Sequence, residues 1–574
     1  MNIKQFIPAF DWLANYKKEQ FKGDLSAGLT VGVMLIPQGM AYAMIAGLPP
    51  IYGLYASTLP LIIYALLGTS RQLAVGPVAM VSLLTAAGIG TLAEGGTELY
   101  IMLAITLAFM VGLIQFLLGV FRLGFLVNFL SHPVISGFTS AAALIIGLSQ
   151  LKHLLGIELA RSHHIHEILL QAFEKIGEIN WVTFAIGIGG IIIIKGIKKI
   201  HKSIPGPLVL VILSILIVYG LNLTTQGVKV VGEVPSGLPS FSIPDFSWTT
   251  IQSLLPVALA IALVSFMESI AVAKAIQSKH KNYKIVPNQE LIGLGLANIG
   301  GSFLQSYPVT GGFSRTAIND QSGAKTGMAS IISALLIMLT LLFLTPLFYY
   351  LPKAVLASVI MVAVFGLIDT DEAKHLWHAN RSDFWMLAVT FLATLALGIE
   401  QGIGIGVILS LAMIIFRTTR PHTAELGKVP DSHFYRNVAR FDGLEERKEL
   451  LIYRFDAQLY FANINYFKES LEELVAKKGK DLKTIILCFN SITNLDSSAV
   501  HMLEELIDDY KNQNIKVLFT GVRGPLRDTM EKSHLIEKIG AQNLFMGIQG
   551  AVDFIDNKPS TFKPQSYILQ TNEE

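Results

Sequence analysis

The sequence predicts a multi-pass α-helical membrane protein of fourteen segments, a seven-plus-seven inverted repeat with two half-helices, followed by a small cytoplasmic α/β domain. Of its 574 residues, 52% are hydrophobic and 15% are charged, against roughly 25% charged residues in soluble domains. The mean hydropathy of +0.53 indicates many membrane spans. Two short segments broken by Gly or Pro occupy corresponding places in the two halves. This pattern excludes a disordered chain and a purely soluble enzyme.

Charge divides the chain into two unlike parts. The last 154 residues hold 19 Lys+Arg and 23 Asp+Glu, and the first 420 hold only 44 charged residues. The near-neutral total argues against nucleic acid as a partner. The single cysteine, Cys488, excludes an intrachain disulfide and a Cys-based metal cluster. We therefore expect a cytoplasmic N-terminal segment, a transmembrane domain, a soluble domain and a C-terminal tail over residues 1–23, 24–420, 435–557 and 558–574.

Apolar runs long enough to cross ~30 Å of hydrocarbon recur along the first part of the chain. The full spans are expected at 25–46, 51–68, 99–121, 133–151, 180–198, 205–222, 252–273, 288–305, 327–350, 353–369, 383–399 and 402–416.

Two further segments are shorter and open with Gly or Pro. Pro77–Gly90 follows the extended stretch Gln72–Gly76, and Gly311–Gly323 follows Ser306–Thr310. Each is predicted to be a half-helix that begins inside the membrane, and each is third in its group of seven. Because seven is odd, the two groups must run in opposite directions. Paired breaks of this kind indicate a substrate site between the two half-helix N-termini.

Loop charges predict the orientation in the lipid bilayer. With a cytoplasmic N-terminus, most basic loop residues fall inside, among them four lysines between 195 and 202, as the positive-inside rule requires. Both termini are then cytoplasmic, and the expected location is the cell membrane. His163, His164 and His166 fall in an extracellular segment. They suggest zinc, but a solvated loop is the favoured interpretation, and we expect no metal site.

Strands and helices alternate after Glu449, which predicts a small α/β domain. At one strand-to-helix turn, Asp496 or a neighbouring serine is expected to be the N-cap. The expected strands are Leu450–Phe455, Thr484–Cys488 and Ile515–Thr520, and the accompanying segments are Asn465–Lys477, Ser498–Lys511 and Leu526–Glu531.

Arg315 lies in the first turn of the second half-helix, where free backbone N–H groups and the helix dipole already favour an anion. A buried arginine in a membrane is costly and is by default a functional candidate; the alternative is that it ties the helix to a carboxylate. Ser314 adds a hydroxyl donor. Val78 and Ala79, after Gly76–Pro77, begin the facing half-helix with a second set of free N–H groups.

Glu268 is a carboxylate in the middle of a span. At that depth it is protonated, paired with Arg315 or bound to a cation, and a structural salt bridge is the plain alternative. Gln38 marks a predicted break in the first span, where its amide donates either to substrate oxygens or to a neighbouring helix. Three other acidic residues lie nearer span ends and are expected to be structural: Glu290, Asp320 and Glu400.

Motifs for chemical catalysis are absent from the sequence. There is no Gly-rich phosphate loop, no HExxH and no Ser-His-Asp spacing in a helical context. Nothing in the chain therefore supports hydrolysis or phosphoryl transfer. We expect neither an enzyme nor a bound cofactor.

Three stretches of the transmembrane part stand out as motifs: Pro49–Tyr55 with the Pro60, Tyr64, Gly68 and Gly76–Pro77 spacing after it, Ser131–Phe138, and Ser306–Thr316. Together they resemble signature blocks of the SulP family of anion transporters. The turn Asp496–Ser498 is similar to one in the STAS domain at the C-terminus of that family. The resemblance covers nearly the whole chain.

The resemblance implies a transport domain with core and gate subdomains, a STAS domain similar to anti-sigma-factor antagonists, and a homodimer. Family members carry sulfate, bicarbonate, chloride, oxalate or dicarboxylates. Carried over, the substrate site falls on Gln38, Val78, Ser314 and Arg315, and the coupling carboxylate is Glu268. Ser498 matches the serine that is phosphorylated in some STAS relatives, although the next residue here is Ala where those relatives often have Gly.

These observations together predict a secondary-active transporter of a small inorganic oxyanion by elevator-type alternating access. Sulfate with proton symport is favoured, because Glu268 combined with Arg315 resembles the proton-coupled sulfate branch. The expected partners are a small anion (sulfate or bicarbonate), H⁺ or Na⁺, and a second copy of the chain. The alternatives are a sodium-coupled bicarbonate transporter, a dicarboxylate transporter, and an anion channel or receptor.

Overall fold

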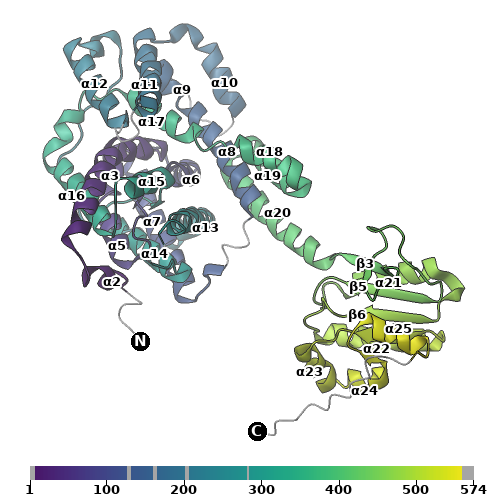
Figure 1. Ribbon diagram of the computed structural model, residues 1–574. Coiled ribbons are helices and arrows are strands. Elements are labelled where there is room, and N and C mark those ends of the chain that lie inside the picture. Colours follow the sequence, from purple (N-terminus) through teal and green to yellow (C-terminus); the bar gives the residue numbers. More distant parts are fainter. Residues whose placement is uncertain (1–6, 126–130, 160–164, 201–205, 281–282, 559–574) are drawn as a thin grey trace. The chain divides into compact units, whose positions relative to one another are not determined.

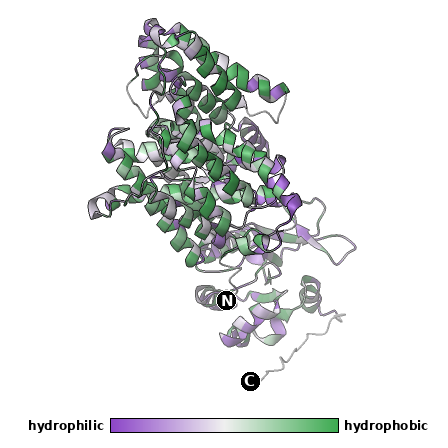
Figure 2. Cartoon of the chain, turned by 90° about the vertical axis from the view of Figure 1, so that its left-hand side faces the viewer, coloured by the Kyte–Doolittle hydropathy of each residue, from purple (hydrophilic) through white to green (hydrophobic). Residues whose placement is uncertain are grey.

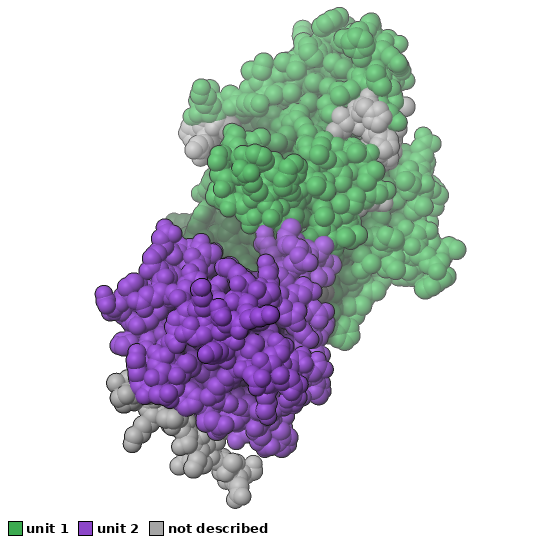
Figure 3. All heavy atoms as spheres, turned by 90° about the vertical axis from the view of Figure 1, so that its right-hand side faces the viewer, with its two compact units in different colours: residues 1–410 green, residues 411–574 purple. Residues whose placement is uncertain are grey.

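The computed structural model describes residues 7–125, 131–159, 165–200, 206–280 and 283–558. The chain forms two compact units, residues 1–410 and 411–574 (Figure 3). The first unit consists almost wholly of helices, and hydrophobic residues predominate along them (Figure 2). Six described helical stretches are long and apolar enough to cross a membrane, and five shorter apolar helices accompany them.

The first half of this unit runs from α2 to α12. Its elements are α2 (Ala9–Leu13), α3 (Lys18–Ile45), α4 (Ile51–Tyr55), α5 (Leu59–Leu67), β1 (Val75–Gly76), α6 (Ala79–Gly90), α7 (Glu98–Val120), α8 (His132–Ser149), α9 (Leu151–Leu155), α10 (Ile165–Glu174), α11 (Trp181–Ile200) and α12 (Gly206–Gly220).

The second half repeats the order of a long helix, a second helix, a short strand and a short helix. Its elements are α13 (Trp248–Gln277), α14 (Pro287–Ser302), β2 (Thr310–Gly311), α15 (Phe313–Gln321), α16 (Met328–Leu339), α17 (Lys353–Phe365), α18 (Thr370–Ala379) and α19 (Arg381–Leu397). Helix α20 (Ile399–Thr419) begins in this unit and ends in the second. The two half-helices α6 and α15 follow short extended segments, as the sequence predicts.

The helices of the first unit pack in two groups, which we call the core group and the gate group (Figure 1). In the core group α7 packs on α14 and α13, α3 packs on α16, and α5 packs on α14; the half-helices α6 and α15 also belong here. In the gate group α8 packs on α19, and α11 packs on α17 and α12. The main contacts between the groups are those of α3 with α17 and α12, and of α6 with α8.

The expected break in the first span is wrong. Helix α3 is continuous from Lys18 to Ile45, with Pro37 inside it. A proline removes one backbone hydrogen bond, and neighbouring helices can hold such a helix together. Here Gly39 lies so close to the backbone of Gly53 that neither position has room for a side chain. Tight packing against α4 therefore holds the helix through the proline.

The second unit is an α/β domain built on a six-stranded sheet in the order β4-β3-β5-β6-β7-β8. Strands β5 to β8 are parallel, and β3 is antiparallel to both of its neighbours. The elements are β3 (Thr423–Lys428), β4 (Tyr435–Asn437), β5 (Leu450–Phe455), α21 (Ile464–Lys478), β6 (Thr484–Cys488), α22 (Ser497–Asn512), β7 (Lys516–Thr520), α23 (Gly524–Lys532), α24 (Leu535–Ile539), β8 (Leu544–Phe545) and α25 (Ile548–Ile555).

Both faces of this sheet are buried. Along β5, Leu451 and Tyr453 belong to the larger core cluster, and Leu450 and Ile452 belong to a smaller one on the opposite face, as the two-residue period of a strand requires. The expected start of the domain at 435 omits β3, which forms the antiparallel neighbour of β5. Its sequence TAELGK holds only two apolar residues and consists mostly of residue types that are depleted in strands, so it is hard to recognise as a strand without its partner.

Candidate anion-binding site

The two half-helices begin at one crossing point in the core group. Strands β1 and β2 pair antiparallel, with Val75 opposite Gly311 and Gly76 opposite Thr310. Each strand leads directly into a half-helix, and no side chain caps the first amides of either α6 or α15. Free N–H groups at a helix start favour an anion. The crossing therefore brings two such starts together from distant parts of the sequence.

Arg315 joins the two half-helix starts. Its Nη1 donates a hydrogen bond of 2.5 Å to the carbonyl oxygen of Pro77, and the residue is only 2% exposed. The guanidinium lies against Gly312 and Gly76: a methyl group on Gly312 would stand 2.9 Å from Nη2, and one on Gly76 would stand 3.4 Å from it. Because neither glycine has a side chain, the guanidinium can pack directly against both.

Two further donors of Arg315 are left over. Its Nε and Nη2 are buried, and neither has a hydrogen-bond partner among the described residues. Buried polar groups are almost always paired in proteins, so unpaired ones call for an explanation. Guanidinium donors match the oxygens of an oxyanion in both charge and geometry.

The other predicted substrate residues differ in burial. Val78 and Ala79, at the start of α6, are buried, and Val78 contacts the same space over Gly312 as the guanidinium. Ser314, on α15, is exposed. Gln38, on α3, is 4% exposed, and its Oε1 has no hydrogen-bond partner in the part of the chain that the structure describes.

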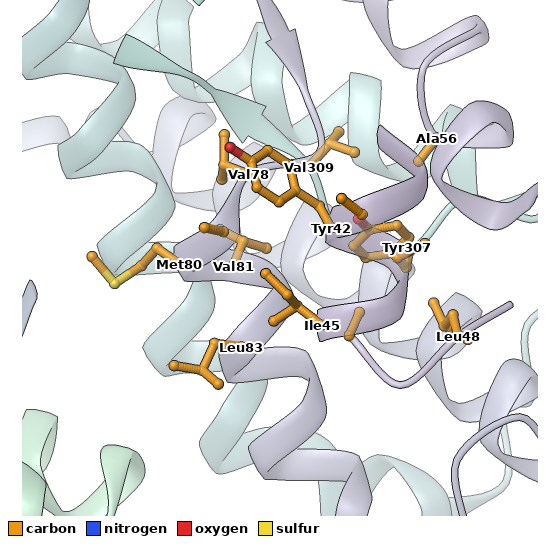
Figure 4. Packing of buried hydrophobic residues seen from close by; sticks show 14 of the residues in the cluster. Tyr42, Ile45, Leu48, Ala56, Val78, Met80, Val81, Leu83, Tyr307 and Val309 are labelled. Atoms are coloured by element: carbon orange, nitrogen blue, oxygen red, sulfur yellow. The ribbon is translucent and has the colours of Figure 1, made fainter. Parts of the chain in front are cut away.

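Tyr42 lies at the candidate site, and the sequence reasoning missed it. It lies one turn after Gln38 on α3, so both project from the same face, and its ring lies beside Val78 (Figure 4). It is close enough to Arg315 and Glu268 to interact electrostatically with both. The available signal was the four-residue spacing from Gln38 in the apolar second half of this helix.

Glu268, on α13, forms no ion pair with Arg315, although the two interact electrostatically. Its Oε2 is buried and has no hydrogen-bond partner within the described ranges. Of the three states considered for this carboxylate, the direct pair with Arg315 is therefore not the one observed. A proton or a cation would supply the missing partner.

A buried polar network holds β2 against α13. The hydroxyls of Ser269 and Thr310 are 2.6 Å apart, Gly311 N donates to Ser269 Oγ at 2.8 Å, and Thr310 Oγ1 donates to Ser265 O at 2.7 Å. Asn298 of α14 binds the backbone of the residue before β2 through both its oxygen and its nitrogen. The two serines, four residues apart on either side of Glu268, were a second signal that the sequence reasoning did not use.

Two of the remaining acidic residues are tied to neighbouring backbone or basic groups. Glu290 is fully buried and accepts hydrogen bonds of 2.6 Å from Tyr64 Oη and from the backbone and hydroxyl of Thr69. Asp320 contacts His280 and Lys279. The side chain of Glu400 lies outside the described residues, as do residues 163 and 164 and the side chain of His166.

In the second unit, Asp496 caps α22: its carboxylate accepts from Ala499 N at 2.8 Å. The expected N-cap at this turn is therefore confirmed. Ser498 is part-buried in the first turn of the same helix.

No group of three or more His, Cys, Asp or Glu side chains that could hold a metal ion occurs among the described residues.

The helical first unit and its anion-favouring crossing define a multi-pass membrane transporter with a C-terminal α/β domain. The chain matches the sulfate permease family over residues 21–390 and the STAS domain over residues 443–551. It therefore belongs to the sulfate permease family, whose members are transporters and not enzymes. It transports an anion. The resemblance to the SulP family and to a STAS domain is confirmed.

Individual relatives agree over almost the whole chain. It is 41% identical to sulfate transporter 4.1, chloroplastic, of Arabidopsis thaliana, over 96% of this chain and 82% of the relative. It is 35% identical to high affinity sulfate transporter 2 of Stylosanthes hamata, over 98% and 88%. A structure of murine Solute Carrier 26 family member A9, an anion transporter in the inward-facing state, superposes with a TM-score of 0.89 at 26% identity, covering 97% of this chain and 95% of that one.

Proposed function

We propose that this chain is a secondary-active sulfate transporter of the cell membrane that moves sulfate together with protons. The observation that carries the proposal is Arg315, whose two unpaired donors lie between two uncapped helix starts. Sulfate offers several oxygens to such donors, and a divalent anion gains most from a full positive charge in a site of low dielectric. The names of the curated relatives support the same substrate.

Glu268 is the residue that binds and releases the coupled proton. This carboxylate has an unpaired buried oxygen and interacts electrostatically with Arg315 without an ion pair. When sulfate neutralises Arg315, the carboxylate loses the influence of that positive charge, and proton binding becomes more favourable. By thermodynamic reciprocity, protonation then favours sulfate binding. The predicted substrate residues are Gln38, Val78, Ala79, Ser314 and Arg315, and the coupling residue is Glu268.

Transport proceeds by elevator-type displacement of the core group, which carries both half-helices, against the gate group. The division of the first unit into two separately packed groups supports this mechanism. The chain works as a homodimer with both termini in the cytoplasm. The STAS domain assists assembly or regulation, with Ser498 as its candidate regulatory residue.

Uptake of labelled sulfate into proteoliposomes tests the proposal, with pH and Na⁺ gradients imposed separately and bicarbonate, fumarate and chloride as competitors. Accumulation driven by an inward proton gradient alone is the expected result. Accumulation that needs Na⁺ and ignores pH identifies sodium coupling, and stronger competition by bicarbonate or fumarate identifies another substrate. Flux that follows only voltage and the anion gradient identifies a channel, and binding without uptake identifies a receptor.

A further inference from the structure

A second concentration of positive charge lies within the gate group, away from the half-helix starts. It surrounds a cavity of about 320 Å³, which we call the gate pocket. The pocket is formed where four parts of the chain meet: α9 with the residues after it, the start of α11, the first turn of α17 and the loop around 229. The residues that bear on its chemistry are Lys152, His153, Glu158, Thr183, Lys229 and Lys353.

The basic side chains are placed by backbone contacts. Lys353 is the first residue of α17, and its N–H donates to the carbonyl oxygen of Lys229 at 2.9 Å. An isolated bridge between Val230 and Pro352 continues this contact. Pro352 provides no side-chain cap for α17. Two lysines and an uncapped helix start thus lie at one wall of the pocket.

The negative charge in the pocket is smaller than the positive charge. Glu158 forms an ion pair of 2.8 Å with Lys229, and this hydrogen bond lowers the pKa of Glu158, so its carboxylate is charged at neutral pH. Among the described residues that line the pocket it is the one acidic residue, and Lys353 is a further basic residue beside the Glu158–Lys229 pair. The positive charge of Lys353 therefore remains after the pair has formed.

The hydroxyl of Thr183 is a second observation, independent of the charges, that points to a ligand in the pocket. The residue lines the pocket, is only 3% exposed, and its Oγ1 has no hydrogen-bond partner among the described residues. A buried hydroxyl without a partner is rare, and one beside a polar cavity is normally satisfied by a ligand or by ordered water. The size of the pocket, at the lower end of the range for small-molecule sites, leaves room for a small anion and its water.

We propose that the gate pocket is a second anion site, which binds a small tetrahedral oxyanion group of the sulfate or phosphate class through Lys353, Lys229 and the Thr183 hydroxyl. It is separate from the half-helix site and does not depend on the proposed proton coupling. On the predicted topology the pocket opens to the non-cytoplasmic side. A free ion and the phosphodiester of a lipid headgroup present the same chemistry to it.

The test uses the full-length protein with Arg315→Ala, so that the half-helix site is impaired, and measures equilibrium binding of labelled sulfate and labelled inorganic phosphate. The expected result is saturable binding of one anion per chain. Adding Lys353→Gln should weaken it by about tenfold, as the loss of a hydrogen bond to a charged group implies. Thr183→Val, of nearly the same shape, should weaken it by a smaller factor. Lys374→Gln, which changes a highly exposed lysine on α18, is the matched control and should have no effect.

Native mass spectrometry distinguishes a free anion from a lipid headgroup as the occupant of the gate pocket. Phospholipid that stays bound to the Arg315→Ala protein and is lost with Lys353→Gln would identify a headgroup, and binding of the added ions would identify a free anion. Two results would overturn the proposal: the Arg315→Ala protein retains neither an added anion nor phospholipid, or its binding is equally strong with Lys353→Gln and Thr183→Val. Unchanged melting temperatures of the variants exclude misfolding as the cause of a loss.

Discussion

The starts of α6 and α15 are built alike, since each follows one strand of the same antiparallel pair and neither is capped by a side chain. Their side chains differ. The start of α6 is apolar and buried, with Val78 and Ala79, whereas that of α15 carries exposed Phe313 and Ser314 and buried Arg315. Both copies of the repeat therefore supply backbone donors, and only the second supplies a charged side chain. The contrast shows that the two halves of the repeat bring equivalent helix starts together, and that only the second half adds a positive charge to the candidate site.

The largest expected effect comes from removing that charge. Arg315→Ala should weaken sulfate transport by about 100-fold or more, because loss of a buried charged partner costs several kcal/mol. Arg315→Lys keeps the positive charge but lacks the planar guanidinium, so its sulfate transport should lie between that of the wild type and that of Arg315→Ala. Uptake by purified protein in proteoliposomes is the measurement, with thermal melting to establish folding. Wild-type affinity in Arg315→Ala would mean that the two helix starts suffice and that the arginine is structural.

The next largest effect concerns the coupling of sulfate transport to the proton gradient. Glu268→Gln imitates a permanently protonated carboxylate, so this variant should still exchange labelled sulfate across the membrane. It should no longer accumulate sulfate under an inward proton gradient, because the residue cannot load and release a proton. Counterflow exchange and gradient-driven uptake are measured on the same vesicles. Normal proton-driven accumulation by this variant would contradict the assignment of Glu268.

A smaller effect is expected where the two helix starts approach each other. Gly312→Ala places a methyl group 2.9 Å from Nη2 of Arg315, so the guanidinium must shift away from the crossing. Sulfate affinity should fall by roughly tenfold, the effect of a misplaced charged hydrogen bond. Gly189→Ala on α11, where no atom lies within 4 Å of the added methyl group, is the control. Equal affinities for the two variants would show that Arg315 tolerates displacement.

Deleting the STAS domain tests whether the two helix starts alone select the anion. The domain has its own core clusters and a charge density that supports solubility. A chain that ends after α20 should show lower expression or a lower rate and unchanged preference among sulfate, bicarbonate and fumarate. Competition assays on the truncated protein decide the point. A changed order of preference would assign part of the selectivity to the STAS domain.

The smallest expected effect is a loss of folding stability of the STAS domain at low pH. This effect is distinct from the coupling of transport to protons. The pKa of Glu449 is lowered from its usual 4.5 by a hydrogen bond from its own backbone and by Arg447. A lowered carboxyl pKa stabilises the folded domain above pH 4.5 and loses that stabilisation as the pH falls through the lowered value. Urea unfolding of residues 421–557 should therefore show declining stability below pH 4.5. Glu449→Gln should reduce the decline, and an unaltered pH profile in that variant would contradict this role.

Much of the architecture was predictable because its signals are local. Gly76–Pro77 and Gly311–Gly312 mark the ends of extended segments, and each is followed by a short apolar or mixed run that can only be a short helix. The strands β5 and β6 coincide with the predicted ranges because buried parallel strands are continuous apolar runs. Arg315 was identifiable for a related reason, since a charge at a helix start inside a membrane is costly unless it has a use.

Tertiary structure alone decided the partners of these residues. Arg315 bonds to Pro77, which is 238 positions earlier in the chain, and no local pattern encodes a contact that depends on two strands crossing. The absence of an ion pair with Glu268 has the same origin, because it depends on how α13 is placed beside β2. Helix α3 stays continuous through Pro37 because packing against α4 outweighs one lost backbone hydrogen bond. The sequence by itself thus determined where the chain breaks and where its charges lie, and the folded structure determined which groups those breaks and charges meet.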